Sequence, residues 1–193
     1  MSEKLHDTAP TLLEFLDAQP AIRDANPATT ELYFDLDETM FRQYYDPVRG
    51  HIKDMLIGNW RPDMLDALRG LRERGFQQIH ILSSAQSRYI EKALEIFEAQ
   101  FGEDPAEFFG QRLSTRDLPD VRLASKAEAI GVVSEEAKGR GARAVFIDDA
   151  RLSFSDPFEY DQDDKGFDYI QIDHEQYFRG KGAELYQIEM PWD

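Results

Sequence analysis

The stretch ELYFDLDETMF, residues 31–41, is the part of the sequence that decides the fold. Its apolar run, residues 32–34, stops abruptly at Asp35, which is the pattern of a short buried strand that ends in acidic residues. Two later apolar runs end in the same way, one at Ser83 and one at Asp148. Repeated apolar strands, each followed by polar side chains at its carboxyl end, are typical of an α/β sheet whose binding site lies at one edge.

Predicted helices alternate with these predicted strands along the chain. The strands are expected at residues 32–34, 78–82, 144–147 and 167–172, and the helices near residues 12–16, 62–75, 87–100 and 126–138. Strands that alternate with helices form right-handed βαβ units, whose helices cover both faces of the sheet. The predicted fold class is therefore α/β and Rossmann-like, with a mainly parallel sheet flanked by helices.

The length of the chain fits one main domain. Residues 1–29 are predicted to form an N-terminal helical arm or lid, and residues 30–193 a single α/β domain. Residues 40–59 are mixed in character and predict a compact loop or hairpin, which we interpret as a flap. The intervals between the strand ends are too short to hold a second full domain.

Composition excludes several classes of protein. The 193 residues include 22 Lys and Arg against 38 Asp and Glu, giving a net charge of -16, and no cysteine. The absence of cysteine excludes a disulfide scaffold and favours a reducing compartment, so we expect a cytoplasmic protein. The acidic charge disfavours nucleic acid as a partner, and no apolar stretch is long enough to suggest a membrane partner. The sequence does not indicate an oligomeric state.

Five polar side chains follow the three apolar runs, and together they predict a metal site. They are Asp35, Asp37, Ser83, Asp148 and Asp149. Clustered carboxylates repel one another unless a cation neutralises them, and Mg²⁺ prefers oxygen ligands together with a substrate phosphate. Lys126, between the second and third strands, is the candidate for the positive charge that a phosphoryl group needs.

The order Asp, Asp, Ser, Lys, Asp, Asp resembles the four motifs of the haloacid dehalogenase-like (HAD-like) superfamily of phosphatases. The first motif stands here as LYFDLDET, the second as IHILS and the fourth as VFIDD, while the third is a lone basic residue. The resemblance implies a HAD-like fold with a small flap and no full cap domain. It also implies a Mg²⁺-dependent phosphomonoester hydrolase that works through an aspartyl phosphate.

The resemblance implies a role for each matched residue. Asp35 would be the nucleophile and Asp37 the general acid and base. Ser83 would hydrogen-bond the phosphoryl oxygens, and Lys126 would be the third-motif cation. The implied metal ligands are Asp35, Asp37 through its backbone carbonyl, Asp148 and Asp149. The candidate substrate-binding residues are Thr39, Ser84 and Arg42.

Within the superfamily, the sequence resembles the NLI-interacting-factor type, which includes phosphatases of the RNA polymerase II C-terminal domain. The DLDET of that group stands verbatim at residues 35–39, and SSAQSRYIE carries Tyr89 at the matching offset. Tyr89 and Pro62 are interpreted as helix-packing residues. The chain departs from the group where Ser83 replaces the usual threonine and where the last motif reads DDA. The resemblance implies a phosphorylated protein as the substrate.

Other interpretations share these residues. A phosphatase for a nucleotide or sugar phosphate would use the same motifs, and so would a phosphate-sensing or noncatalytic module. A switch module would keep its aspartyl phosphate, whereas a hydrolase would turn it over rapidly. Arg122 and Lys138 compete with Lys126 for the role of the third-motif cation.

Overall fold

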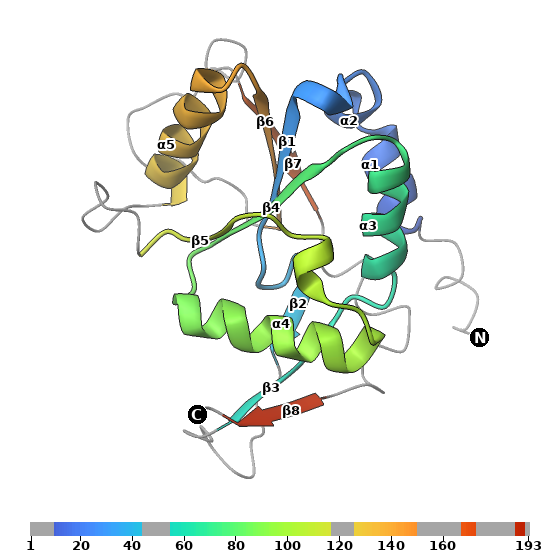
Figure 1. Ribbon diagram of the computed structural model, residues 1–193, viewed down its shortest axis with the longest axis vertical. Helices are drawn as coiled ribbons and strands as arrows, with labels where there is room; N and C mark the ends of the chain where they lie inside the picture. The colour runs from blue at the N-terminus through green and yellow to red at the C-terminus, as the bar shows by residue number, and fades with distance from the viewer. Residues whose placement is uncertain (1–9, 44–54, 117–125, 150–166, 173–187, 192–193) are drawn as a thin grey trace, which may run out of the picture.

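A computed structural model of the chain describes residues 10–43, 55–116, 126–149, 167–172 and 188–191 (Figure 1). Its central element is a five-stranded sheet in which all neighbouring strands are parallel. The strand order is β5 (Arg112–Ser114), β4 (Gln78–Ser83), β1 (Thr30–Phe34), β6 (Arg143–Asp148) and β7 (Phe167–Gln171). The predicted α/β class with a mainly parallel sheet is therefore confirmed, and all five strands end at the same edge.

Helices cover both faces of this sheet, which explains why β1 is buried along its whole length. The helices are α1 (Leu12–Ala18), α2 (Pro20–Arg23), α3 (Met64–Glu73), α4 (Ser87–Phe101) and α5 (Lys126–Gly139), with short 3₁₀ helices η1 (Pro27–Thr29) and η2 (Pro105–Glu107). Leu32 and Phe34 belong to a core shared with α1, α3 and α4, whereas Tyr33 packs with residues of α5. Figure 1 accordingly shows α5 on the opposite side of the sheet from α1 and α3.

The segment predicted as a flap contributes to a second, smaller sheet. Here β2 (Phe41–Gln43) and β8 (Ile188–Pro191) pair on either side of β3 (Met55–Trp60), both antiparallel to it. Gly58 is required by this pairing, because a Cβ there would lie 2.1 Å from the ring of Phe41. The described ends of residues 40–59 thus form the antiparallel pair expected of a hairpin, while residues 44–54 lie outside the described part.

The N-terminal helix is built into the core. Leu12 and Leu16 of α1 have no exposed surface, and they pack in the cluster that contains α3. Thr11 and Glu14 form a reciprocal capping box at the start of the helix. The backbone N–H of Leu12 also donates to Asp63 at 2.8 Å, just before α3 begins. The helix predicted near residue 12 is confirmed, and residues 10–18 contribute to the packing of the domain.

Most predicted elements are found close to their expected bounds. The helix predicted to open at Pro62 begins at Met64, and Gly75 follows it with a positive φ of 96°. Strand β8 has no counterpart among the predicted strands. None of the helices that the structure describes is both long enough and apolar enough to cross a bilayer.

Candidate active site

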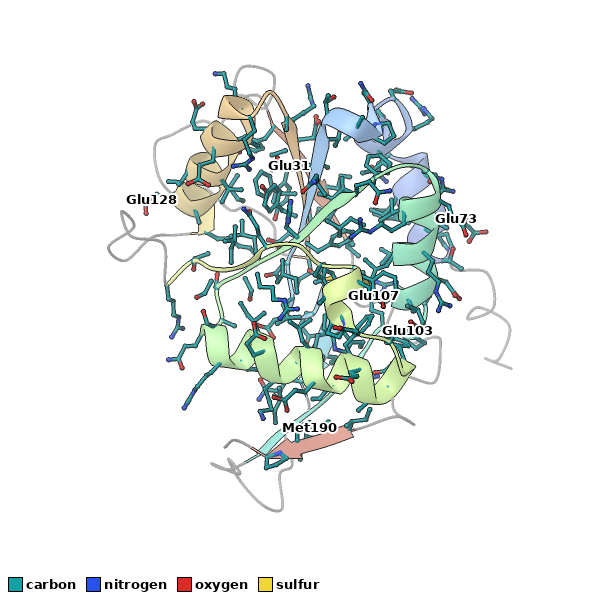
Figure 2. The ribbon with its side chains drawn as sticks, in the orientation of Figure 1. Glu31, Glu73, Glu103, Glu107, Glu128 and Met190 are labelled. Atoms are coloured by element: carbon teal, nitrogen blue, oxygen red, sulfur yellow. The ribbon has the colours of Figure 1, made fainter. Side chains whose placement is uncertain are left out.

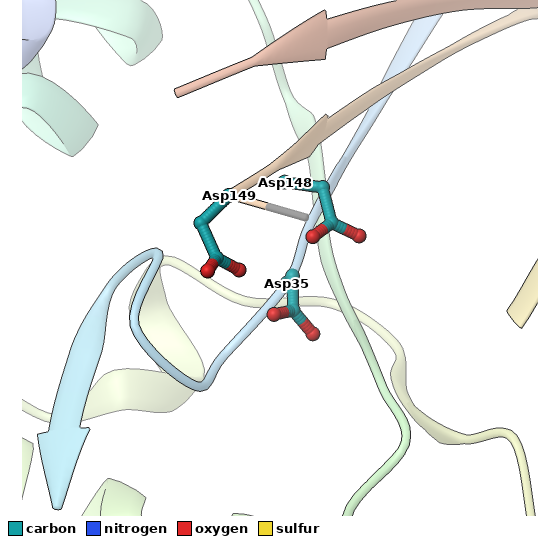
Figure 3. Close-up of side chains that lie close together, drawn as sticks. All are labelled: Asp35, Asp148 and Asp149. Atoms are coloured by element: carbon teal, nitrogen blue, oxygen red, sulfur yellow. The ribbon is translucent and has the colours of Figure 1, made fainter. Parts of the chain in front are cut away.

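Three aspartates converge where β1 and β6 end. Asp35 directly follows β1, Asp148 is the last residue of β6, and Asp149 follows it. The backbone N–H of Asp35 donates to the carbonyl of Ile147 at 2.8 Å, so the parallel pairing continues to the aspartate itself. One carboxylate oxygen from each aspartate lies within 4.8 Å of those of the other two. Figure 3 shows the three carboxylates directed toward a shared space.

Lys126 supplies the positive charge beside these acids. It is the first residue of α5, and its Nζ lies 2.7 Å from Oδ1 of Asp35 and forms a second ion pair with Asp148. Burial alone would lower the pKa of Lys126, but the two carboxylates hold it above its ordinary value. The competing candidate Lys138 is exposed near the other end of α5 and pairs with Glu135. Arg122 lies outside the described residues.

The charge of this group is not balanced by Lys126. Burial raises the pKa of Asp35 to about 7, because desolvation and the charge of Asp148 outweigh the attraction of Lys126. Burial raises the pKa of Asp149 as well, with Asp148 adding to the effect. One ammonium group therefore faces three carboxylates. A divalent cation would remove this repulsion, and the oxygen-only donor set fits Mg²⁺.

Thr39 holds Asp149 in place from a fully buried position. Its hydroxyl accepts a hydrogen bond from the backbone N–H of Asp149 at 2.8 Å and lies 3.3 Å from Oδ1 of the same residue. The turn that brings Thr39 here is tight: Glu38 has a φ of 59°, which is uncommon for a residue other than glycine. Thr39 thus contacts Asp149 in the structure, whereas the sequence predicted that it binds substrate.

Tyr89 of α4 contacts the second aspartate of the first motif. Its hydroxyl donates to Oδ1 of Asp37 at 2.5 Å, across 52 positions of sequence. Burial raises the pKa of Asp37, although the hydrogen bond from Tyr89 opposes this shift. The ring of Tyr89 also packs edge-on against Phe41, with the centroids 6.2 Å apart. Tyr89 therefore makes a polar contact with Asp37 in addition to the helix packing that the sequence predicted for it.

The remaining predicted residues lie at or just after the end of β4 and on β2. Ser83 is buried at the end of β4, next to β1, and its Oγ accepts from the N–H of Ala85 at 3.1 Å. Ser84 is exposed, and Arg42 on β2 is half-buried. Ser83 thus ends its strand at the same edge as the aspartates, as the parallel topology requires.

Two further residues near this edge were not found by sequence reasoning. Tyr169 of β7 hydrogen-bonds Asp148, and burial together with the charge of Asp148 raises the pKa of the phenol. Arg116, two residues after β5, donates from Nε to the carbonyl oxygen of Ser84 at 3.0 Å. Neither residue belongs to a recognisable motif, so only the folded arrangement reveals them.

Comparison of this chain with protein-family models, with curated proteins and with solved structures finds no match. The geometry of the strand-end aspartates and Lys126 is therefore the main ground for assigning a function.

Proposed function

We propose that this protein is a Mg²⁺-dependent phosphomonoester hydrolase in which Asp35 carries the phosphoryl group as an aspartyl phosphate. The observation that carries the proposal is the convergence of Asp35, Asp148 and Asp149, with Lys126 bridging the first two. Three clustered carboxylates with a single ammonium group beside them are costly to keep unless they bind a further cation. The HAD-like order of these residues in the sequence supports the same function independently.

Mg²⁺ would be held by oxygens of Asp35, Asp148 and Asp149, and by resemblance also by the backbone carbonyl of Asp37. When bound, it would neutralise charge on the phosphoryl oxygens and on the carboxylates. Thr39 orients Asp149 for this task, and Tyr169 orients Asp148. Hydrogen bonds to metal ligands of this kind fix their geometry and raise metal affinity.

In the first step, a carboxylate oxygen of Asp35 attacks phosphorus, and the bond from phosphorus to the leaving oxygen breaks. Asp37 delivers a proton to that oxygen, which departs as an alcohol. The raised pKa of Asp37 favours the protonated form that this step needs. Because Tyr89 donates to Oδ1, the second oxygen of Asp37 remains for the proton. Lys126 stabilises negative charge beside Asp35 during the transfer.

In the second step, Asp37 acts as the base. Its carboxylate takes a proton from a water molecule, whose oxygen attacks phosphorus. The bond between phosphorus and Asp35 breaks, which frees inorganic phosphate and regenerates both carboxyl groups in their starting states. The net reaction consumes one water for each phosphomonoester.

A phosphorylated protein segment is the proposed substrate. Between β1 and α3 the chain has room only for the segment that contributes β2 and β3, and among the described residues no separate cap domain covers the aspartates. Among the described residues, this favours a large substrate over a small one that a cap encloses. The net charge of -16 favours a substrate that is neutral or basic around its phosphate. Specificity constants for phosphopeptides and for nucleotide or sugar phosphates, compared at equal Mg²⁺, distinguish this substrate class from small metabolites.

Release of phosphate from an aryl phosphate tests the proposed chemistry. Asp35→Asn is expected to abolish turnover, because an amide is a poor nucleophile, while the fold is retained. The matched control is Asp66→Asn, which changes an exposed aspartate on α3 and should leave turnover unchanged. Removal of Mg²⁺ should abolish turnover in the wild type, and its return should restore it. Turnover by Asp35→Asn at the wild-type rate would overturn the proposal.

A further inference from the structure

A pocket of about 400 Å³ lies at the opposite edge of the main sheet from the aspartates, where the strands begin. Glu31 of its lining precedes Asp35 by four residues along β1, which is about 13 Å of extended strand. Its polar lining comes from four different elements or their connections, and includes Thr29, Glu31, His80, Gln111 and Arg140. Figure 2 shows Glu31 near the start of β1, beside the end of α5.

The carboxylate of Glu31 in this pocket is already paired. Arg140 donates from Nε to Oε1 of Glu31 at 3.0 Å and from Nη2 to Oε2 at 2.7 Å. The hydroxyl of Tyr33 donates to the same Oε2 at 2.5 Å. The bonds from Arg140 lower the pKa of Glu31, so its carboxylate is ionised and saturated with donors. Both oxygens of Glu31 therefore already accept hydrogen bonds.

His80 presents a donor that has no partner in the described part of the chain. Its Nδ1 accepts from the backbone N–H of Gln111 at 2.9 Å, which places the ring proton on Nε2. Burial lowers the pKa of His80 to about 4, so the ring is neutral at physiological pH. The side chain is only 4% exposed, and no described residue accepts a hydrogen bond from Nε2. Nε2 is not among the fully enclosed polar atoms that lack a partner, so it keeps contact with the open space of the pocket and is accessible to a ligand acceptor.

Charges of both signs act on His80. Glu31 has the largest electrostatic effect on its pKa, and Arg140 and Arg72 act in the opposite sense. Arg140 keeps its Nη1 group uncommitted among the described residues, because its recorded bonds use Nε and Nη2. The pocket therefore offers two donors, Nε2 of His80 and Nη1 of Arg140, that the described residues leave unused.

We propose that this pocket binds a small molecule through an oxyanion, either a carboxylate or a phosphate group, with Nε2 of His80 and Nη1 of Arg140 as donors. Such a group accepts hydrogen bonds from both donors, and the guanidinium of Arg140 favours its negative charge. The site is separate from the aspartates, and the proposal does not depend on the hydrolase activity.

Gly141 allows a test that leaves both donors in place. It lines the pocket with a φ of 75°, and a Cβ there would meet no atom within 4 Å. Asparagine and aspartate tolerate this backbone region better than other residues with side chains. Gly141→Asp adds a negative charge at the pocket, and Gly141→Asn is its neutral control of the same shape.

The experiment titrates the full chain, without Mg²⁺, with inorganic phosphate and separately with acetate, and follows the imidazole nitrogen resonances of His80 by NMR. Saturable shifts are expected in the wild type and in Gly141→Asn, with affinity about tenfold weaker in Gly141→Asp. The probe that binds more tightly identifies the oxyanion class. Absence of saturation with both probes would overturn the proposal, as would equal affinities of the two variants. Because the readout is binding at His80, either result is independent of whether Asp35→Asn abolishes turnover.

Discussion

Replacing Tyr89 with phenylalanine removes one hydroxyl and leaves the ring that packs against Phe41. The main hydrogen bond lost is the one to Oδ1 of Asp37, at 2.5 Å in a half-buried setting, and a longer one of 3.4 Å to Oε1 of Gln43 is lost with it. A hydrogen bond to a charged group contributes about 1.5–3 kcal/mol, so kcat should fall roughly ten- to a hundredfold if Tyr89 positions the acid. The free energy of unfolding should fall by no more than that same contribution of about 1.5–3 kcal/mol, because the packing is retained.

The assay compares an alkyl phosphate with a nitrophenyl phosphate. The alkyl leaving group depends strongly on protonation by Asp37, whereas nitrophenolate departs readily without it. Tyr89→Phe should therefore lose more kcat on the alkyl ester. Tyr169→Phe is the matched control: it removes a hydroxyl that bonds Asp148, so its loss should be similar for both esters. Wild-type kcat in Tyr89→Phe, or an equal loss on both substrates, would refute the assignment of Tyr89 as a positioning residue.

Three other predictions concern the metal, the lysine and the buried histidine. Thr39→Val should weaken Mg²⁺ binding about tenfold by releasing Asp149, with Thr39→Ser restoring it; calorimetry showing unchanged affinity would contradict this. Lys126→Met should make thermal stability depend more strongly on Mg²⁺ than in the wild type, because Asp35 and Asp148 lose the ammonium group that pairs with them. Equal stabilisation of both proteins by Mg²⁺ would argue against a charge-balancing role for Lys126. The folded pKa of His80 is depressed from 6.5 to about 4, so the unfolded chain takes up a proton first as the pH falls. Between pH 6.5 and about pH 4, the free energy of unfolding of the wild type should therefore fall by roughly 3 kcal/mol more than that of His80→Gln, as measured by denaturant unfolding. Parallel pH profiles of the two proteins would exclude the effect.

The sheet and its strand-end aspartates could be predicted because their pattern is local. An apolar run that stops at an acid marks both the buried strand and its end, and parallel topology then brings the ends of β1 and β6 together. Lys126 followed from its order in the chain, and the structure places it against Asp35 and Asp148. Once the sheet is formed, its parallel topology and the order of the chain largely determine these contacts.

The contacts that sequence reasoning missed depend on how distant segments pack. Tyr89 reaches Asp37 only because α4 lies against the turn after β1, and Thr39 reaches Asp149 across 110 positions. Neither pair has a spacing that a periodic pattern could reveal. Strand β8 has a short sequence, Ile-Glu-Met-Pro, and it becomes a strand because it pairs with β3.

Detection of the phosphorylated aspartate tests the central claim most directly. In Asp37→Asn the nitrophenyl ester can still phosphorylate Asp35, but the base for the second step is missing. Rapid acid quench followed by peptide mass analysis should then find one phosphoryl group on Asp35, accumulating in Asp37→Asn and turning over rapidly in the wild type. A stable aspartyl phosphate in the wild type would instead indicate a phosphate-sensing switch. Hydrolysis without any phosphoryl group on Asp35 in Asp37→Asn, or a phosphoryl group on another residue, would contradict the account.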